Sequence, residues 1–182
     1  MTLAAIIFSS LKRCELATIY DAMTKYNYEG PRTSVKVSRR FKASPERVFD
    51  AWTDPAMASQ WFFTTKSSKT TYELDVRVGG AYTITRVSSG KTYVAVGTYI
   101  EIDRPRRLVF TFGMPQFAAD FDTVIVEIEA DGDGCVLTLT QEGLRPGYEK
   151  STVNGWGKMF TLLEAAFDPK TPLQAGKKRG GS

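Results

Sequence analysis

The stretch VNGWGKMFTLLEAAF, residues 153–167, is the most strongly patterned part of the chain and decides the fold. Its large apolar residues recur at i, i+3, i+4, i+7 and i+11, which are Trp156, Met159, Phe160, Leu163 and Phe167. This spacing predicts one buried face of a helix. We place Trp156 at the start of that helix, with Gly155 and Gly157 letting its ring enter. The pattern leaves open whether the face closes a core or roofs a cavity.

Seven segments before this helix are predicted to be β-strands. In SVKVSRRF, residues 34–41, apolar and polar side chains alternate, as in a strand with one buried side. Six more strands follow between Thr70 and Gln141: YELDVRV, AYTITRV, TYVAVGTYIEI, RLVFTF, TVIVEIE and CVLTLTQ. Short connectors rich in Gly, Asp and Pro join most of them, so neighbouring strands should be antiparallel.

Two short helices are predicted between the first and second strands. Ser44 and Asp54 are good helix N-caps, and each is followed by a proline suited to the first helical position. The first helix gathers Val48, Phe49 and Trp52 on one face. The order is therefore strand, two short helices, about six strands and a long helix, which predicts an α+β fold with an antiparallel sheet.

The charge distribution divides the chain into one domain and two ends. Residues 34–167 hold 16 of the 24 Lys and Arg and 16 of the 20 Asp and Glu, so the net charge of +4 comes from the ends. We expect an N-terminal extension over residues 1–33, partly helical or mobile, and a flexible basic tail over residues 168–182. Met23 is an alternative native start. A neutral domain lacks the clustered basic face of a nucleic-acid-binding protein.

The cysteines and the start of the chain indicate the cellular compartment. Cys14 and Cys135 form no CxxC pair, and the apolar start of the chain lacks the basic residues of a secretory signal. No run is long enough to span a membrane. We therefore expect a cytoplasmic protein without disulfides, either a monomer or a homodimer.

The sequence contains no histidine, which excludes Ser-His-Asp and Cys-His catalysis and any metal site with histidine ligands. Glu127 and Glu129 share one side of a strand, and we assign that side to solvent. The DGDGCV turn departs from a calcium loop at Cys135 and Val136. No catalytic residue, metal ligand or cofactor is therefore predicted.

Large rings are abundant on the predicted strands: Tyr72, Tyr82, Tyr93, Tyr99, Phe110, Phe112 and Phe117. A curled sheet around one helix often leaves a hollow, where tyrosines can present both apolar faces and hydroxyls. Among charged residues, Arg77, Arg86 and Glu101 are the candidates to orient a ligand, and the alternative is that they form ion pairs at the surface.

Five motifs in order carry a resemblance to a known family: ASPERVFDAWTDPAMASQWF, LDVRVGGAYTI, GTYIEIDRPRRLVFTF, TVIVEIEADGDGCVLTLTQEGL and NGWGKMFTLLEAAF. Over residues 34–167 the chain resembles the START-like, helix-grip superfamily. Its closest likeness is to the branch named for the C-terminal domain of the activator of the heat-shock-protein-90 ATPase. The resemblance implies a curved sheet of six or seven strands that grips the C-terminal helix over a mainly apolar cavity.

The resemblance also implies which residues line that cavity: Trp61, Phe62, Tyr82, Tyr99, Phe110, Phe112, Trp156, Met159, Phe160 and Leu163. Many members of the branch have a histidine just before the GW of the last helix, where this chain has Asn154. A proton-transfer or metal role at that position is therefore not expected.

Three functions follow from the sequence and the resemblance. The first is binding of a small hydrophobic molecule, a lipid or an aromatic metabolite, without catalysis. The second is a module that docks a protein partner, as a co-chaperone does. The third is a cyclase-like enzyme that uses tyrosine, carboxylate or ordered water in place of histidine.

Overall fold

The computed structural model describes residues 28–65 and 67–167. The predicted tail, most of the predicted N-terminal extension, Met23 and Cys14 lie outside these residues. The elements run in the order β1 (Thr33–Phe41), α3 (Pro45–Thr53), α4 (Pro55–Ala58), β2 (Lys69–Leu74), β3 (Ala81–Ser88), β4 (Lys91–Asp103), β5 (Arg107–Phe112), β6 (Asp122–Asp131), β7 (Gly134–Leu144) and α5 (Glu149–Ala166). The predicted α+β order is confirmed.

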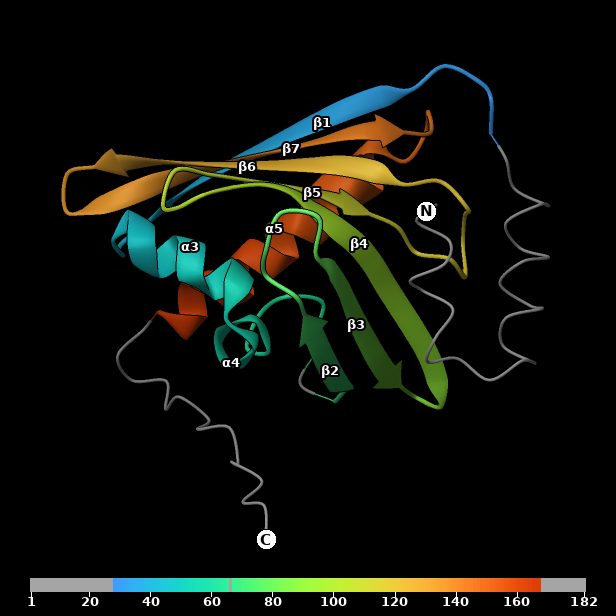
Figure 1. Ribbon diagram of the computed structural model, residues 1–182, viewed down its shortest axis with the longest axis horizontal. Helices are drawn as coiled ribbons and strands as arrows, with labels where there is room; N and C mark the ends of the chain where they lie inside the picture. The colour runs from blue at the N-terminus through green and yellow to red at the C-terminus, as the bar shows by residue number, and fades with distance from the viewer. Residues whose placement is uncertain (1–27, 66, 168–182) are drawn as a thin grey trace, which may run out of the picture.

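All seven strands form one antiparallel sheet in the order β1-β7-β6-β5-β4-β3-β2. Consecutive strands from β2 to β7 are neighbours, and β1 pairs with β7. The sheet curves around α5, and β1 and β2 lie at its two edges (Figure 1). This is the helix-grip arrangement that the resemblance implies.

The prediction for the second strand was wrong in its bounds. YELDVRV alternates through residue 78, yet β2 covers Lys69–Leu74 and ends before Asp75. Residues 75–80 instead form a turn, in which the Gly79 N–H donates to the Tyr99 carbonyl and the Tyr99 N–H donates to the Gly80 carbonyl. A turn with exposed valines imitates the alternation of a strand, so the pattern alone cannot separate them.

The two short helices begin where their caps predict. The Ser44 hydroxyl accepts from the Arg47 N–H, and the Asp54 carboxylate accepts from the Ala56 N–H at 2.8 Å. Helix α3 buries four residues, Val48, Phe49, Ala51 and Trp52. The two helices and the turn after them cover one end of the concave face of the sheet (Figure 1).

Helix α5 begins earlier than the sequence suggested. It starts at Glu149, so Trp156 lies in the middle of the helix, and a Cβ atom added at Gly155 or Gly157 would meet nothing within 4 Å. These glycines are therefore not needed for Trp156 to enter the core, which corrects that prediction. The predicted stripe is otherwise confirmed, because Trp156, Phe160, Leu163 and Phe167 are buried and Met159 packs against the core.

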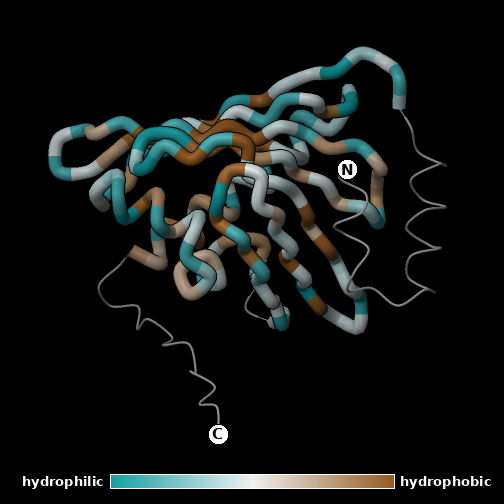
Figure 2. The backbone as a smooth tube through the Cα atoms, viewed as in Figure 1, coloured by the Kyte–Doolittle hydropathy of each residue, from teal (hydrophilic) through white to brown (hydrophobic). Residues whose placement is uncertain are grey.

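The core lies between the concave face of the sheet and the helices. Apolar residues gather along the middle of the strands, whereas the connections are mostly polar (Figure 2). The Phe41 ring at the end of β1 meets the rings of Phe160 and Phe167 edge-on, at 6.0 and 6.1 Å between centroids. Helix α5 is thus held against the β1 side of the sheet.

One predicted strand aromatic lies elsewhere. Phe117 is in the loop between β5 and β6, where it is 59% exposed and its ring is 6.3 Å from that of Tyr93.

None of the helices among residues 28–65 and 67–167 is long and apolar enough to cross a membrane.

Candidate functional site

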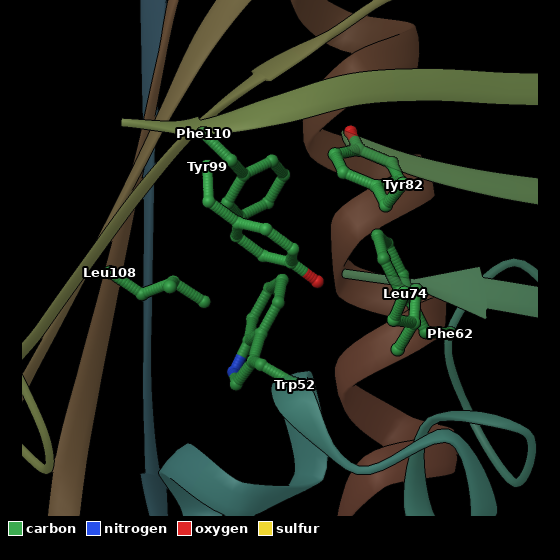
Figure 3. A pocket seen from close by; sticks show the side chains of 7 residues that line it. All are labelled: Trp52, Phe62, Leu74, Tyr82, Tyr99, Leu108 and Phe110. Atoms are coloured by element: carbon green, nitrogen blue, oxygen red, sulfur yellow. The ribbon is translucent and has the colours of Figure 1, made fainter. Parts of the chain in front are cut away.

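A small aromatic pocket lies on the concave side of the sheet, on the β2 to β5 half. Its walls come from α3, the turn after α4 and four strands, and its seven lining residues are Trp52, Phe62, Leu74, Tyr82, Tyr99, Leu108 and Phe110. Its volume open to a water molecule is about 10 Å³, room for roughly one water. We refer to these seven residues as the aromatic pocket (Figure 3).

Strand geometry brings the pocket residues to the same side of the sheet. Tyr99 on β4 pairs with Phe110 on β5, and the register shifts between Tyr99 and Glu101. This β-bulge leaves Ile100 48% exposed while Tyr99 and Ile102 both face inward. The Tyr82 ring lies 5.6 Å from that of Tyr99 and 5.7 Å from that of Phe110.

The two tyrosine hydroxyls of the pocket differ in their partners. The Tyr82 hydroxyl donates to the Thr111 carbonyl at 2.8 Å. The Tyr99 hydroxyl makes no hydrogen bond with the described residues, and it points toward the space between Trp52 and Leu74 (Figure 3). Burial, with the charge of Asp75, raises the pKa of Tyr99 to about 12. Tyr99 therefore stays protonated at neutral pH, as a hydrogen-bond donor facing the pocket.

Trp52 supplies a second donor without a partner. It is 2% exposed, and its Nε1 has neither solvent exposure nor an acceptor among the described residues. By contrast, Trp61 Nε1 donates to the Ala51 carbonyl at 2.9 Å. Buried N–H groups are nearly always paired. The nitrogen of Trp52 lies on the side of the indole turned away from Leu74 and Tyr82, so this free donor faces the back of the wall and not the pocket (Figure 3).

Four of the ten residues expected to line a cavity line the aromatic pocket: Phe62, Tyr82, Tyr99 and Phe110. The structure places the other six in the core around it: Trp61, Phe112, Trp156, Met159, Phe160 and Leu163. The Trp156 ring lies 5.9 Å from Trp52 and 6.1 Å from Phe62, so α5 supports the pocket from behind.

Three lining residues were not predicted from the sequence: Trp52, Leu74 and Leu108. Trp52 was detectable, since it shares the apolar face of the first short helix with Val48 and Phe49. Leu74 and Leu108 gave no signal, because an inward leucine on a strand has the same pattern whether it meets a pocket or packed core.

A buried chain of polar groups lies beside Trp156. Its Nε1 donates to Gln141 Oε1 at 2.6 Å, and Gln141 Nε2 donates to Asp122 Oδ2 at 2.6 Å. Gln141 is 4% exposed and is the only buried polar side chain in the described part of the chain. Burial raises the pKa of Asp122, and the hydrogen bond from Gln141 opposes that effect.

This burial predicts a pH dependence. A carboxyl whose folded-state pKa lies above its unfolded value favours folding most when protonated, so its contribution falls as pH rises through the folded-state pKa. Asp122→Asn keeps a carbonyl acceptor for Gln141 and removes the titration. We expect the free energy of unfolding of the variant, relative to the parent protein, to rise between pH 3 and pH 7 in urea denaturation.

Asp133→Asn is the matched control, because Arg40 lowers the pKa of that exposed carboxyl. Its pH profile should change with the opposite sign, with stability lost relative to the parent as pH rises. Parallel profiles for the parent and Asp122→Asn would show that the Asp122 carboxyl is not destabilised by burial.

Most other charged candidates form ion pairs at the surface. Arg77 pairs with Asp75 at 2.8 Å, and Glu101 pairs with Arg107 at 3.2 Å. Glu127 also contacts Arg107, at 2.6 Å. Arg86, in contrast, lies on the same side of β3 as Tyr82 and has no carboxylate partner among the described residues.

The described residues contain no candidate metal cluster, and Asn154 lies outside the aromatic pocket. Within residues 28–65 and 67–167, no group of three or more Cys, Asp or Glu side chains is placed to hold a metal ion. Asn154 is exposed, so it faces away from the core. The side chain at this position therefore does not shape the aromatic pocket.

Comparison with known proteins agrees with this architecture. The family model described as Activator of Hsp90 ATPase homolog 1-like protein matches residues 42–168. No curated protein matches the chain.

Solved structures share the fold over nearly their whole length. SA2116 from Staphylococcus aureus is 26% identical, with a TM-score of 0.68 over 77% of this chain and 96% of its own. CV1439 from Chromobacterium violaceum is 25% identical, with a TM-score of 0.66 over 75% of this chain and 97% of its own. An AHSA1-like protein from Aeromonas hydrophila is 19% identical, with a TM-score of 0.64 over 74% of this chain and 91% of its own. The chain thus belongs to the family of Activator of Hsp90 ATPase homolog 1-like proteins, with the START-like helix-grip fold.

Proposed function

We propose that the protein binds a small hydrophobic molecule, a lipid or an aromatic metabolite, in the aromatic pocket. The observation that carries the proposal is the Tyr99 hydroxyl, a protonated donor with no partner in the described part of the chain, set in a wall of rings and leucines. A ligand with one acceptor oxygen and an apolar body satisfies both features.

The pocket has to widen for such a ligand, since it holds about one water molecule as it stands. Its Leu74 wall is the part suited to move. Leu74 ends β2, a six-residue edge strand that pairs only with β3. Strand edges of this kind belong to the less stable parts of a fold. Displacement of this edge would open the pocket without moving α5.

The test is binding of a library of lipids and aromatic metabolites, followed by thermal shift and by tryptophan fluorescence. A ligand with an acceptor oxygen is expected to raise the melting temperature and to change the emission of Trp52. Tyr99→Phe should weaken its binding about tenfold, the equivalent of one buried hydrogen bond.

Tyr148→Phe is the control, because it removes a hydroxyl from a side chain that is 60% exposed outside the pocket. If the parent protein and Tyr99→Phe bind the ligand with equal affinity, the Tyr99 hydroxyl does not contact the ligand. A second outcome would contradict the proposal: no compound of the library binds, and a protein partner is recovered with the chain from its own cells in a one-to-one ratio. The co-chaperone-like function would then replace ligand binding.

A further inference from the structure

Arg86 is the one arginine of the described residues that is half-buried without an ion-pair partner. Eight of the others contact a carboxylate, and Arg47 is exposed. The Nε of Arg86 is buried and has no acceptor within these residues. A buried N–H of a charged group normally gains an acceptor, so this side of the guanidinium lacks the group that would satisfy it.

Two aromatic rings hold the guanidinium in place. The Cζ of Arg86 lies 4.7 Å from the centroid of Phe63 and 4.8 Å from that of Tyr93. Rings that contact a guanidinium leave its N–H edge as the part able to bind, and that edge matches the two oxygens of a carboxylate. Phe63 has φ 58°, an unfavourable conformation for a bulky residue. Backbone strain of this kind gathers at binding sites.

Hydroxyl groups lie next to this arginine. Thr70 is the partner of Arg86 in the β2–β3 register. The Thr70 hydroxyl is 3.2 Å from that of Ser68, which is 3.5 Å from that of Thr64. Hydroxyls can donate to an anion in addition to the guanidinium. The surroundings therefore favour a negatively charged oxygen group.

Arg86 also faces the proposed ligand site. It is four residues from Tyr82 on β3 and on the same side of the sheet, so their Cα atoms lie about 13 Å apart. Phe63 is the chain neighbour of Phe62, which lines the aromatic pocket. A chain-like or fused-ring acid can thus reach from one position to the other once the β2 edge has moved.

We propose that Arg86 binds the carboxylate of the hydrophobic ligand, so that the ligand is an amphipathic acid whose largely apolar body enters the aromatic pocket and carries the acceptor oxygen for Tyr99. This inference rests on the proposed function and narrows its ligand class. An apolar acid in water then has two anchors, the charge pair at Arg86 and the burial of its body among the rings.

Matched acid and alcohol pairs test the inference by isothermal titration. The probes are decanoate against 1-decanol, and 2-naphthoate against 2-naphthol. Within the pair that binds, the acid is expected to bind about tenfold more tightly than the alcohol. Arg86→Gln should remove this preference and leave the alcohol affinity unchanged. Arg86→Lys should keep part of it, since it retains the charge but loses the planar pair of donors.

Arg77→Gln is the control, because it removes the same charge from an arginine that is paired with Asp75 at the surface. Circular dichroism and melting temperature verify that each variant is folded. Equal affinity for acid and alcohol, or an acid preference that survives Arg86→Gln, overturns the inference and leaves the proposed function standing. If none of the four probes binds and no compound of the wider library binds either, both the inference and the proposed function are overturned.

Discussion

Replacing Trp156 with alanine is expected to lower the free energy of unfolding by about 3–5 kcal/mol, as deletion of a large buried ring generally does. Trp156 is 2% exposed, and its ring lies within 6.4 Å of those of Trp52, Phe62, Phe112 and Phe160. The substitution leaves a void where these rings meet. It also removes the donor to Gln141, which leaves the side-chain carbonyl of a buried residue without this hydrogen bond.

Urea denaturation at neutral pH measures this loss, and Val153→Ala on the same helix is the control. Val153 is 38% exposed, so its substitution should change the free energy of unfolding by no more than about 0.5 kcal/mol. Trp156→Phe keeps one aromatic ring but loses the second ring of the indole together with its N–H, so it should fall between the two. A loss below about 1 kcal/mol for Trp156→Ala would show that the ring cluster is loosely packed.

Replacing Gly97 with alanine is expected to destabilise the protein by about 3 kcal/mol or more, the upper part of the range for an overfilled core. An added Cβ atom would overlap the Thr111 carbonyl oxygen and come within 2.6 Å of the Tyr82 ring. The carbonyl belongs to β5 and accepts from the Tyr82 hydroxyl, so neither neighbour can move without breaking a contact of the pocket.

Gly155→Ala is the matched control, since its Cβ would meet nothing within 4 Å in the middle of α5. Alanine is the better helix former, so this variant should be more stable than the parent by about 1 kcal/mol. Thermal and urea denaturation of the two variants therefore give shifts of opposite sign. If Gly97→Ala were as stable as the parent protein, the close approach of β3, β4 and β5 at Gly97 would be disproved.

Predictability from sequence differed between the fold and the site for a physical reason. The caps at Ser44 and Asp54 are local chemistry, and the burial stripe of α5 follows from helical spacing, so both were predicted. The end of β2 was not, because it depends on backbone bonds between Gly79, Gly80 and the distant Tyr99. Long-range pairing of this kind leaves no mark in the local pattern.

The site depended still more on tertiary structure. Tyr82 and Tyr99 have equivalent patterns as inward tyrosines. Among the residues that the structure describes, Tyr82 finds an acceptor, a carbonyl on another strand, and Tyr99 does not. Likewise Arg77, Arg86 and Glu101 were equal candidates. Two of them meet a partner of opposite charge, and Arg86 meets two rings. Whether a charged side chain is satisfied is decided by neighbours that the fold brings together.

The pairing of β1 with β7 has a consequence for the order in which this domain is made. Val35 pairs with Gln141 and Phe41 with Cys135, so β1 leaves the ribosome long before its partner β7 has been synthesised. Contacts so distant along the chain slow folding, because the loop between them must close first. Until then the apolar side of β1 is exposed on the nascent chain. The hairpins from β2 to β6 can form during translation, whereas closure of the sheet and docking of α5 must wait until β7 and α5 have been synthesised.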